Sequence, residues 1–156
     1  MNVTVSGKTR HYRTVTFDGR ANCVQLIEQR LLPHEFKIVS TPDFRATAAA
    51  IRDMIVRGAG AIGATAAYGL AQGARAFRGK NPDAFAKHVE VVLEAIKAAR
   101  PTAVDPVNAM LQVRTHMQAG TSVEEQQALA LAAAEEFAHE DAAQCHAIGQ
   151  HGARLI

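Results

Sequence analysis

The chain has 156 residues and a mass of 16.7 kDa, the size of one domain with a buried core. Its 17 basic and 15 acidic side chains give a formal net charge of +2 without long runs of either sign, so the sequence lacks the basic stripe of a nucleic-acid-binding surface. Hydrophobic residues make up 48% and aromatic residues only 5%, a balance that favours closely packed helices over a β-sandwich.

The cysteines and the hydropathy pattern indicate a reduced, cytoplasmic protein. Cys23 and Cys145 lie far apart without a CxxC pattern, so we expect neither a disulfide nor a zinc site. The N-terminus lacks the apolar core of a signal peptide, and no later stretch reaches the ~18 uninterrupted apolar residues of a membrane span. His139 and His146 are two helical turns apart, too far for one ion, so no metal is predicted.

Residues 1–40 are predicted to form a small antiparallel β-sheet. β-rich runs lie at 3–5, 11–17, 23–27 and 36–39, separated by turn formers at Ser6-Gly7 and Asp18-Gly19. An Asp-Gly pair between two such runs is typical of a hairpin. Because Pro33 cannot donate to a strand ladder, we expect the chain to turn after Leu32.

Residues 41–156 are predicted to form a bundle of about five helices, so the fold class is α+β. The first helix is expected to begin with Thr41 as its N-cap and Pro42 at its first position, and to end at Arg57-Gly58. A second helix follows over 58–77, and its many glycines and alanines would allow close approach to neighbouring helices. We expect this helix to be buried.

Three further helices follow in the prediction. Asn81-Pro82 opens one that runs to Arg100-Pro101, with apolar residues on one face. Pro106 begins the next, which Gly120 ends. Ser122, followed three residues later by Glu125, is a capping-box pattern for a last helix that runs to about residue 149.

The string Gly58-Ala59-Gly60-Ala61-Ile62-Gly63 matches GxGxxG, but a dinucleotide fingerprint must follow a strand, and a predicted helix precedes this one. Glycines at a helix start nevertheless leave backbone N–H groups open to an anion. Arg57, just before them, would add a charge-assisted contact to a phosphate. The residues alone leave open a second interpretation, in which the glycines serve packing and Arg57 is solvated.

A second segment, residues 100–106 (RPTAVDP), forms a rigid turn between two predicted helices, with Arg100 at its mouth. Taken alone, this pattern is typical of an ordinary helix stop. Its interest comes from the other blocks that it accompanies.

Four blocks resemble, in the same order, those of the methylthioribose-1-phosphate isomerase family, which is related to the regulatory α, β and δ subunits of translation initiation factor 2B. Residues 26–33 (LIEQRLLP) resemble the family's "LDQ…LP". Residues 50–63 (AIRDMIVRGAGAIG), continuing to the AYG of 67–69, are similar to "AI..M.VRGAPAIG…AAYG". Residues 100–104 match "RPTAV", and residues 140–153 resemble "ED…IG.HGA". The resemblance therefore spans nearly the whole chain.

The resemblance implies which residues bind substrate. In this family the RGA triplet and the arginine of RPTAV contact the phosphorylated sugar, which carries over to Arg57, Gly58, Ala59 and Arg100. The family's catalytic cysteine, in a "THCNAG" block, and its catalytic aspartate, in a Rossmann-like C-terminal domain, would fall beyond Ile156. We therefore expect no catalytic residue in this chain, which would be the inactive N-terminal half. Cys145 precedes that block, and we interpret it as a helix-packing thiol.

The implied reaction is an intramolecular oxidation and reduction, from an aldose 1-phosphate to the ketose 1-phosphate, most directly with S-methyl-5-thioribose 1-phosphate in methionine salvage. A phosphorylated pentose is the expected partner, a homodimer the expected assembly, and no cofactor is expected. The chain departs from the family pattern at Glu28, at Gly60 and at Asp105, where the family has aspartate, proline and asparagine. Gly60 also occurs in ribose-1,5-bisphosphate isomerase. The alternatives are therefore that or another pentose-phosphate isomerase, or a non-catalytic subunit like those of initiation factor 2B.

Overall fold

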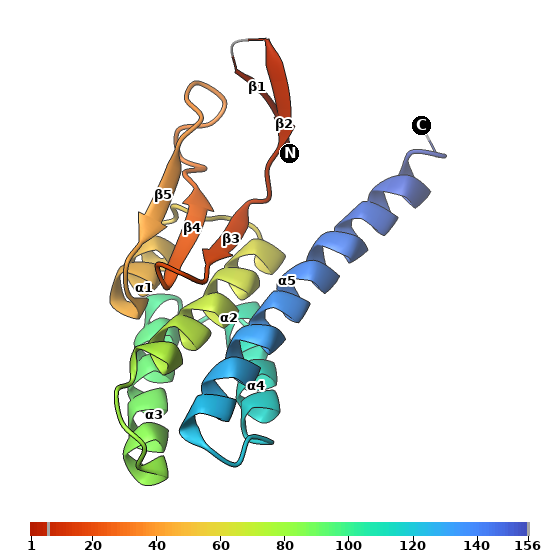
Figure 1. Cartoon of the computed structure of the whole chain (residues 1–156). Helices are drawn as coiled ribbons and strands as arrows, with labels where there is room; N and C mark the ends of the chain where they lie inside the picture. Colours follow the sequence, from red (N-terminus) through yellow and green to blue (C-terminus); the bar gives the residue numbers. More distant parts are fainter. Residues whose placement is uncertain (6, 156) are drawn as a thin grey trace.

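The computed structural model describes residues 1–5 and 7–155, and there it has five short strands followed by five helices (Figure 1). The prediction of an antiparallel β-region followed by about five helices is confirmed. Ser6, half of the predicted Ser6-Gly7 turn, lies outside the described residues.

The strands form two antiparallel sheets where the sequence predicted one. A hairpin pairs β1 (Asn2–Val5) with β2 (Lys8–His11), and a separate sheet has the order β3 (Val15–Asp18), β4 (Cys23–Ile27), β5 (Ile38–Thr41). The predicted run 11–17 is thus broken between the two sheets. The Asp18-Gly19 hairpin is confirmed, and the Asp18 carboxylate accepts from the amides of Arg20 and Ala21 at 2.9 and 3.1 Å.

The helices are α1 (Phe44–Arg52), α2 (Ala59–Ala76), α3 (Pro82–Ala99), α4 (Asp105–Met117) and α5 (Val123–Gly152). The prediction of Thr41 as the N-cap of the first helix is wrong. Asp43 caps α1 by accepting from the amides of Arg45 and Ala46 at 2.8 and 2.9 Å. Thr41 instead ends β5, where its buried hydroxyl donates to the carbonyl of Val24 at 3.1 Å.

The ends of two helices also differ from the prediction. α1 ends at Arg52, so residues 53–58, which were predicted to be helical, form a loop. α4 ends at Met117 with Gln118 as its cap, before the predicted stop at Gly120. The first difference matters for function because the loop leads directly into the N-terminus of α2.

α2 is the central element of the bundle, and its residues 62–74 are buried on all sides. The predicted close approach of neighbours to its small residues is confirmed. A Cβ added to Gly73 would lie 2.5 Å from the Cγ1 of Val92 on α3, and one added to Gly69 would lie 2.9 Å from Ile96. The buried amide of Gln72 donates to the carbonyl oxygens of Thr41 and Asn22 at 2.8 and 2.9 Å, which ties this helix to the three-stranded sheet.

α5 has two halves with different surroundings. Its start agrees with the predicted cap, since the Ser122 hydroxyl accepts from the Glu125 amide at 3.1 Å, while the Glu125 carboxylate bonds Thr121. Ala130, Ala134 and the alanines around them pack on the bundle, but the last turns project beyond it (Figure 1). Cys145 lies on the projecting part and is exposed, so its interpretation as a helix-packing thiol is wrong.

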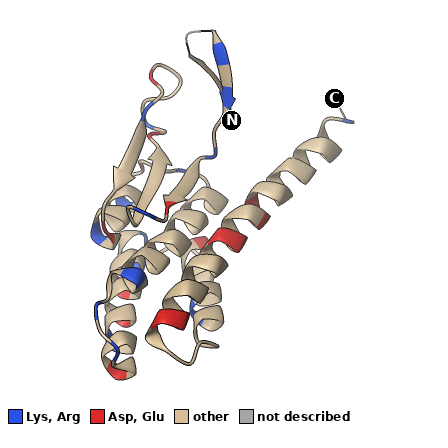
Figure 2. Cartoon of the chain, viewed as in Figure 1, with Lys and Arg blue, Asp and Glu red and all other residues tan. Residues whose placement is uncertain are grey.

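Charged side chains are spread over several elements in Figure 2, with basic residues on β2 and acidic ones on the helices. In the part of the chain that the structure describes, none of the helices combines the length and the apolar character needed to cross a membrane. The same residues contain no group of three histidine, cysteine or carboxylate side chains arranged to hold a metal ion.

Candidate functional site

The loop of residues 53–58 joins α1 to α2 and contains two left-handed backbone positions. Met54 has φ of 60°, and Gly58 has φ of 93°. A positive φ favours glycine, so Gly58 suits its position, whereas Met54 is held there by surrounding contacts. The side chain of Val56, between them, is fully buried and anchors the loop in the core.

Residues at the end of β4 hold this loop through hydrogen bonds. The backbone amide of Gln29 donates to the carbonyl of Ile55 at 2.9 Å, and the side-chain oxygen of Gln29 accepts from the backbone amide of Arg57. The guanidinium of Arg30 donates to the carbonyl of Asp53 at 3.3 Å. The loop is thus fastened at both ends by consecutive residues of one segment.

Arg30 is itself held by a buried carboxylate. Glu28, with its side chain 6% exposed, accepts from Arg30 Nε at 2.8 Å and from Arg30 Nη2 at 2.7 Å. These bonds from Arg30 lower the pKa of Glu28 below its usual value, although burial acts in the opposite direction. Glu28, where the family pattern has aspartate, therefore holds Arg30 in position to bond the loop.

A cavity of about 250 Å³ opens where this loop enters α2. It is lined by residues of the loop end, of α2 and of the turn before α4, namely Gly58, Ala59, Ile62, Arg100, Ala103, Asp105 and Pro106. Gly58 is the N-cap of α2 and has no side chain to satisfy the first free amides of the helix. Those amides and the positive end of the helix dipole favour an anion.

Arg100 supplies the charge at this cavity. Its position directly after α3 as the C-cap, in an extended turn, directs the side chain toward the loop, where Nη1 lies 3.2 Å from the sulfur of Met54. A thioether is a weak acceptor, so this contact leaves the guanidinium able to bind a stronger one. Asp105 adds a carboxylate to the same cavity, in the first turn of α4.

The structure brings three of the predicted site residues together and leaves one apart. Gly58, Ala59 and Arg100 line the small cavity, although Arg100 is 41 residues from Ala59 in the sequence. Arg57 is exposed and does not line the cavity, while its backbone amide is bound to Gln29. The glycine before α2 and the arginine after α3 could be recognised in the sequence as candidate cavity residues. The hydrogen bonds of residues 28–30 to the loop could not, because nothing in their spacing indicates that contact.

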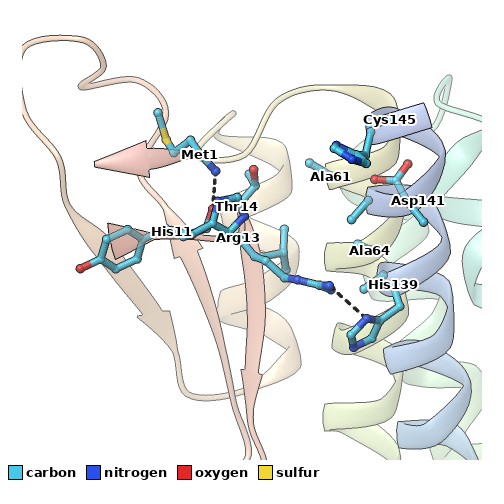
Figure 3. A pocket seen from close by; sticks show the side chains of 15 residues that line it. Met1, His11, Arg13, Thr14, Ala61, Ala64, His139, Asp141 and Cys145 are labelled. Carbon is cyan, nitrogen blue, oxygen red and sulfur yellow. Dashed lines mark hydrogen bonds between the residues drawn. The ribbon is translucent and has the colours of Figure 1, made fainter. Parts of the chain in front are cut away.

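A larger cavity, of about 550 Å³, lies on another face of α2, between the segment 11–15 and α5 (Figure 3). Its floor includes Ala61 and Ala64, and at one side Arg13 Nη2 lies 3.0 Å from Nδ1 of His139. None of the residues predicted to bind substrate lines it. Asp141 borders it and packs on Gly60, where an added Cβ would clash with the carboxylate of Asp141.

Comparisons with known proteins give a family match, several relatives and two similar structures. The model of the initiation factor 2 subunit family matches residues 55–156. A methylthioribose-1-phosphate isomerase of Chloroflexus aurantiacus is 43% identical over 147 residues, which are 92% of this chain and 42% of that protein. A methylthioribose-1-phosphate isomerase of Picosynechococcus is 40% identical over 136 residues, 86% of this chain and 39% of that protein. The chain thus spans about two fifths of the length of these relatives.

Among solved structures, the subunit delta of translation initiation factor eIF-2B from A. fulgidus matches with a TM-score of 0.85 and 32% identity, over 94% of this chain and 42% of that one. The 5-methylthioribose 1-phosphate isomerase from Pyrococcus horikoshii matches with a TM-score of 0.76 and 35% identity, over 82% of this chain and 36% of that one. Both similarities reach well beyond the glycine-rich segment.

Proposed function

Because the chain belongs to the initiation factor 2 subunit family, we propose that it is the substrate-gripping N-terminal part of an aldose-1-phosphate to ketose-1-phosphate isomerase. Methylthioribose 1-phosphate is the proposed substrate, since relatives that are 38–43% identical to this chain carry that activity in their names. Neither a cofactor nor a metal is part of the proposal.

One observation carries this proposal, the meeting of Gly58, Ala59 and Arg100 at a single cavity. The free amides at the start of α2 give hydrogen-bond donors without a side chain in the way, and Arg100 gives a permanent positive charge. A phosphate ester with its charged oxygens matches both kinds of donor. Arg57, at the rim, would add charge to attract the anion without lining the cavity.

The chemistry assigns this part of the protein a binding role. An anomeric phosphate prevents simple opening of the sugar ring, so a general acid has to protonate the ring oxygen before the transfer between C1 and C2. The amides and Arg100 would hold the phosphate in place, and the walls from α2 and α4 would exclude water around it. Asp105 lines the same cavity, and because a carboxylate repels a phosphate, it would face the sugar hydroxyls.

A second candidate function is a non-catalytic binding subunit, and the match to the eIF-2B subunit delta at a TM-score of 0.85 favours it. A third, a ribose-1,5-bisphosphate or other pentose-phosphate isomerase, would use the same cavity. We favour the isomerase because the relatives that are 40% and 43% identical are named isomerases, whereas the eIF-2B subunit delta is 32% identical.

The test combines binding with turnover. We expect the chain to bind methylthioribose 1-phosphate by calorimetry more tightly than methylthioribose, and to show no turnover alone. A fusion of this chain to the remaining C-terminal part of the Chloroflexus relative is expected to isomerise the substrate. Binding without turnover in the fusion would favour the regulatory subunit, and a preference for ribose 1,5-bisphosphate would favour the other isomerase. The absence of phosphate-dependent binding would contradict all three.

We further propose a cytoplasmic location and a homodimer. Both cysteines are free thiols, which suits a reducing compartment. Ile148 on the projecting part of α5 is 71% exposed, and Leu155, just beyond the helix, is 89% exposed; a second subunit would cover these apolar side chains. Sedimentation at high concentration is expected to show a dimer, and a clean monomer would contradict this part of the proposal.

A further inference from the structure

We propose that Gln29 is a positioning residue, which fixes the loop 53–58 so that the first amides of α2 are held ready for the phosphate. This inference rests on the function proposed above. It concerns a residue that lies outside the cavity and bonds the backbone amide of Arg57, the neighbour of the cavity-lining Gly58.

The loop needs an external support because of its own conformation. Two of its residues, Met54 and Gly58, have positive φ, and Gly58 has no side chain to restrain its rotation. The buried side chain of Val56 holds the middle of the loop. Between Val56 and Gly58, the backbone amide of Arg57 donates to the side-chain oxygen of Gln29. Among the described residues, no other hydrogen bond holds that amide.

A single acceptor is enough to set this geometry. A peptide unit is planar, so binding the Arg57 N–H fixes the orientation of the whole peptide between Val56 and Arg57. The backbone then enters Gly58 and α2 from a defined direction. Gln29 holds the other side of the turn as well, because its own amide donates to the carbonyl of Ile55 at 2.9 Å. The two bonds clamp the segment 55–57 to the end of β4.

The residues next to Gln29 make this support rigid. Glu28 is buried and receives two side-chain bonds from Arg30, whose guanidinium also reaches the carbonyl of Asp53. The amide of Glu28 donates to the carbonyl of Lys37 at 2.9 Å, which continues the pairing of β4 with β5. The three-stranded sheet therefore determines where the loop, and through it the anion-binding end of α2, is held.

The experiment compares Gln29→Met, Gln29→Glu and the control Gln25→Met. Methionine resembles glutamine in length but accepts hydrogen bonds only weakly, whereas glutamate keeps the acceptor oxygen and adds a charge. Gln25 lies on β4, four residues before Gln29, and accepts from the Thr16 hydroxyl at 3.4 Å. Amide exchange at Arg57 is measured by NMR without ligand, and the affinity for methylthioribose 1-phosphate is measured by calorimetry.

For Gln29→Met we expect exchange at Arg57 to accelerate about tenfold and the affinity to fall about tenfold, the effect of one lost hydrogen bond. Gln29→Glu is expected to retain slow exchange at Arg57, and Gln25→Met to change neither quantity. Unchanged exchange at Arg57 in Gln29→Met would overturn the proposal. So would an equal acceleration throughout α2 and β4, since Gln29 would then only stabilise the fold. A wild-type chain that binds no phosphate ester would refute the proposed function, while the exchange data would still decide what Gln29 does.

Discussion

The two cavities beside the N-terminal end of α2 differ in how their polar groups are held. At the smaller cavity, of about 250 Å³, the backbone is fixed by hydrogen bonds from Gln29 and Arg30 and by the buried side chain of Val56. At the larger one, of about 550 Å³, the side chains of Arg13 and His139 are exposed and bond each other at 3.0 Å.

This difference shows that volume is a poor guide to the site. A ligand gains affinity from donors that are already in place, because ordering flexible side chains costs conformational entropy. Helix amides cannot rotate away, and the surroundings of the loop keep them directed. The hydrogen-bond donors of the smaller cavity are therefore already held in place before a ligand binds. The substitutions below test this difference between the two cavities.

The largest effect is expected from Arg100→Gln, which keeps a polar side chain at this position but removes its charge. A hydrogen bond to a charged group contributes ~1.5–3 kcal/mol, so the affinity for methylthioribose 1-phosphate should fall by about tenfold to a hundredfold. Calorimetry measures this loss. The matched change in the larger cavity, Arg13→Gln, should leave the affinity within about twofold of wild type, and equal losses in both variants would contradict the assignment.

The next effect concerns two glycines of α2 with different neighbours. Alanine at Gly73 would press on Val92, which is fully buried and cannot move away, so we expect a loss of about 1–3 kcal/mol in the free energy of unfolding. Alanine at Gly60 would meet only the end of the Asp141 side chain, which can rotate toward solvent. Urea titration should therefore find Gly60→Ala nearly neutral, and a similar loss in both variants would show that the region around Gly60 is as rigid as the core.

A smaller effect is expected from Glu28→Gln, which removes the charge that holds Arg30. Because the guanidinium is 43% exposed, we expect a loss of about 1 kcal/mol in the free energy of unfolding at neutral pH. The folded-state pKa of Glu28 lies below its ordinary value of 4.5, so its contribution is complete above that pH and disappears as the pH falls through the folded-state pKa. Urea titrations at several pH values measure the difference from wild type, and a difference that persists at the lowest pH would contradict this cause.

The smallest effect is expected from Arg13→Gln on stability. The Arg13 side chain is exposed and its contact with His139 lies at the surface, so the free energy of unfolding should change by less than about 0.5 kcal/mol. Thermal unfolding of wild type and variant gives this value. A larger loss would mean that the segment 11–15 is fastened to α5 more firmly than the exposed contact indicates.

The sequence allowed prediction of the parts that depend on local patterns. The hairpin at Asp18-Gly19, the proline start of α3, the Ser122 cap and the close packing of α2 each follow from residues near in sequence. The end of α1 could not be predicted, because the apolar spacing continues through Ile55 and Val56, whereas the backbone turns at Met54. Met54 has a positive φ, and the amides of Met54 and Ile55 donate to the carbonyls of Ile51 and Ala50 in this turn.

The candidate site was predictable only in part for the same reason. Glycines before a helix and an arginine after one suggest an anion site, and the fold brings Gly58 and Arg100 to one cavity. The support by residues 28–30 depends on where β4 ends relative to the loop, a contact across more than 20 residues that no periodicity encodes. The exposure of Cys145 likewise depends on how far the bundle extends along α5.

The most direct test of the account is an NMR titration of the wild-type chain with methylthioribose 1-phosphate, following the backbone amides of Gly58 and Ala59 together with those of Arg13 and His139. We predict saturable shifts at Gly58 and Ala59 and none at Arg13 and His139, because the fixed amides at the start of α2 receive the phosphate. Shifts confined to Arg13 and His139, or none at either cavity, would contradict it.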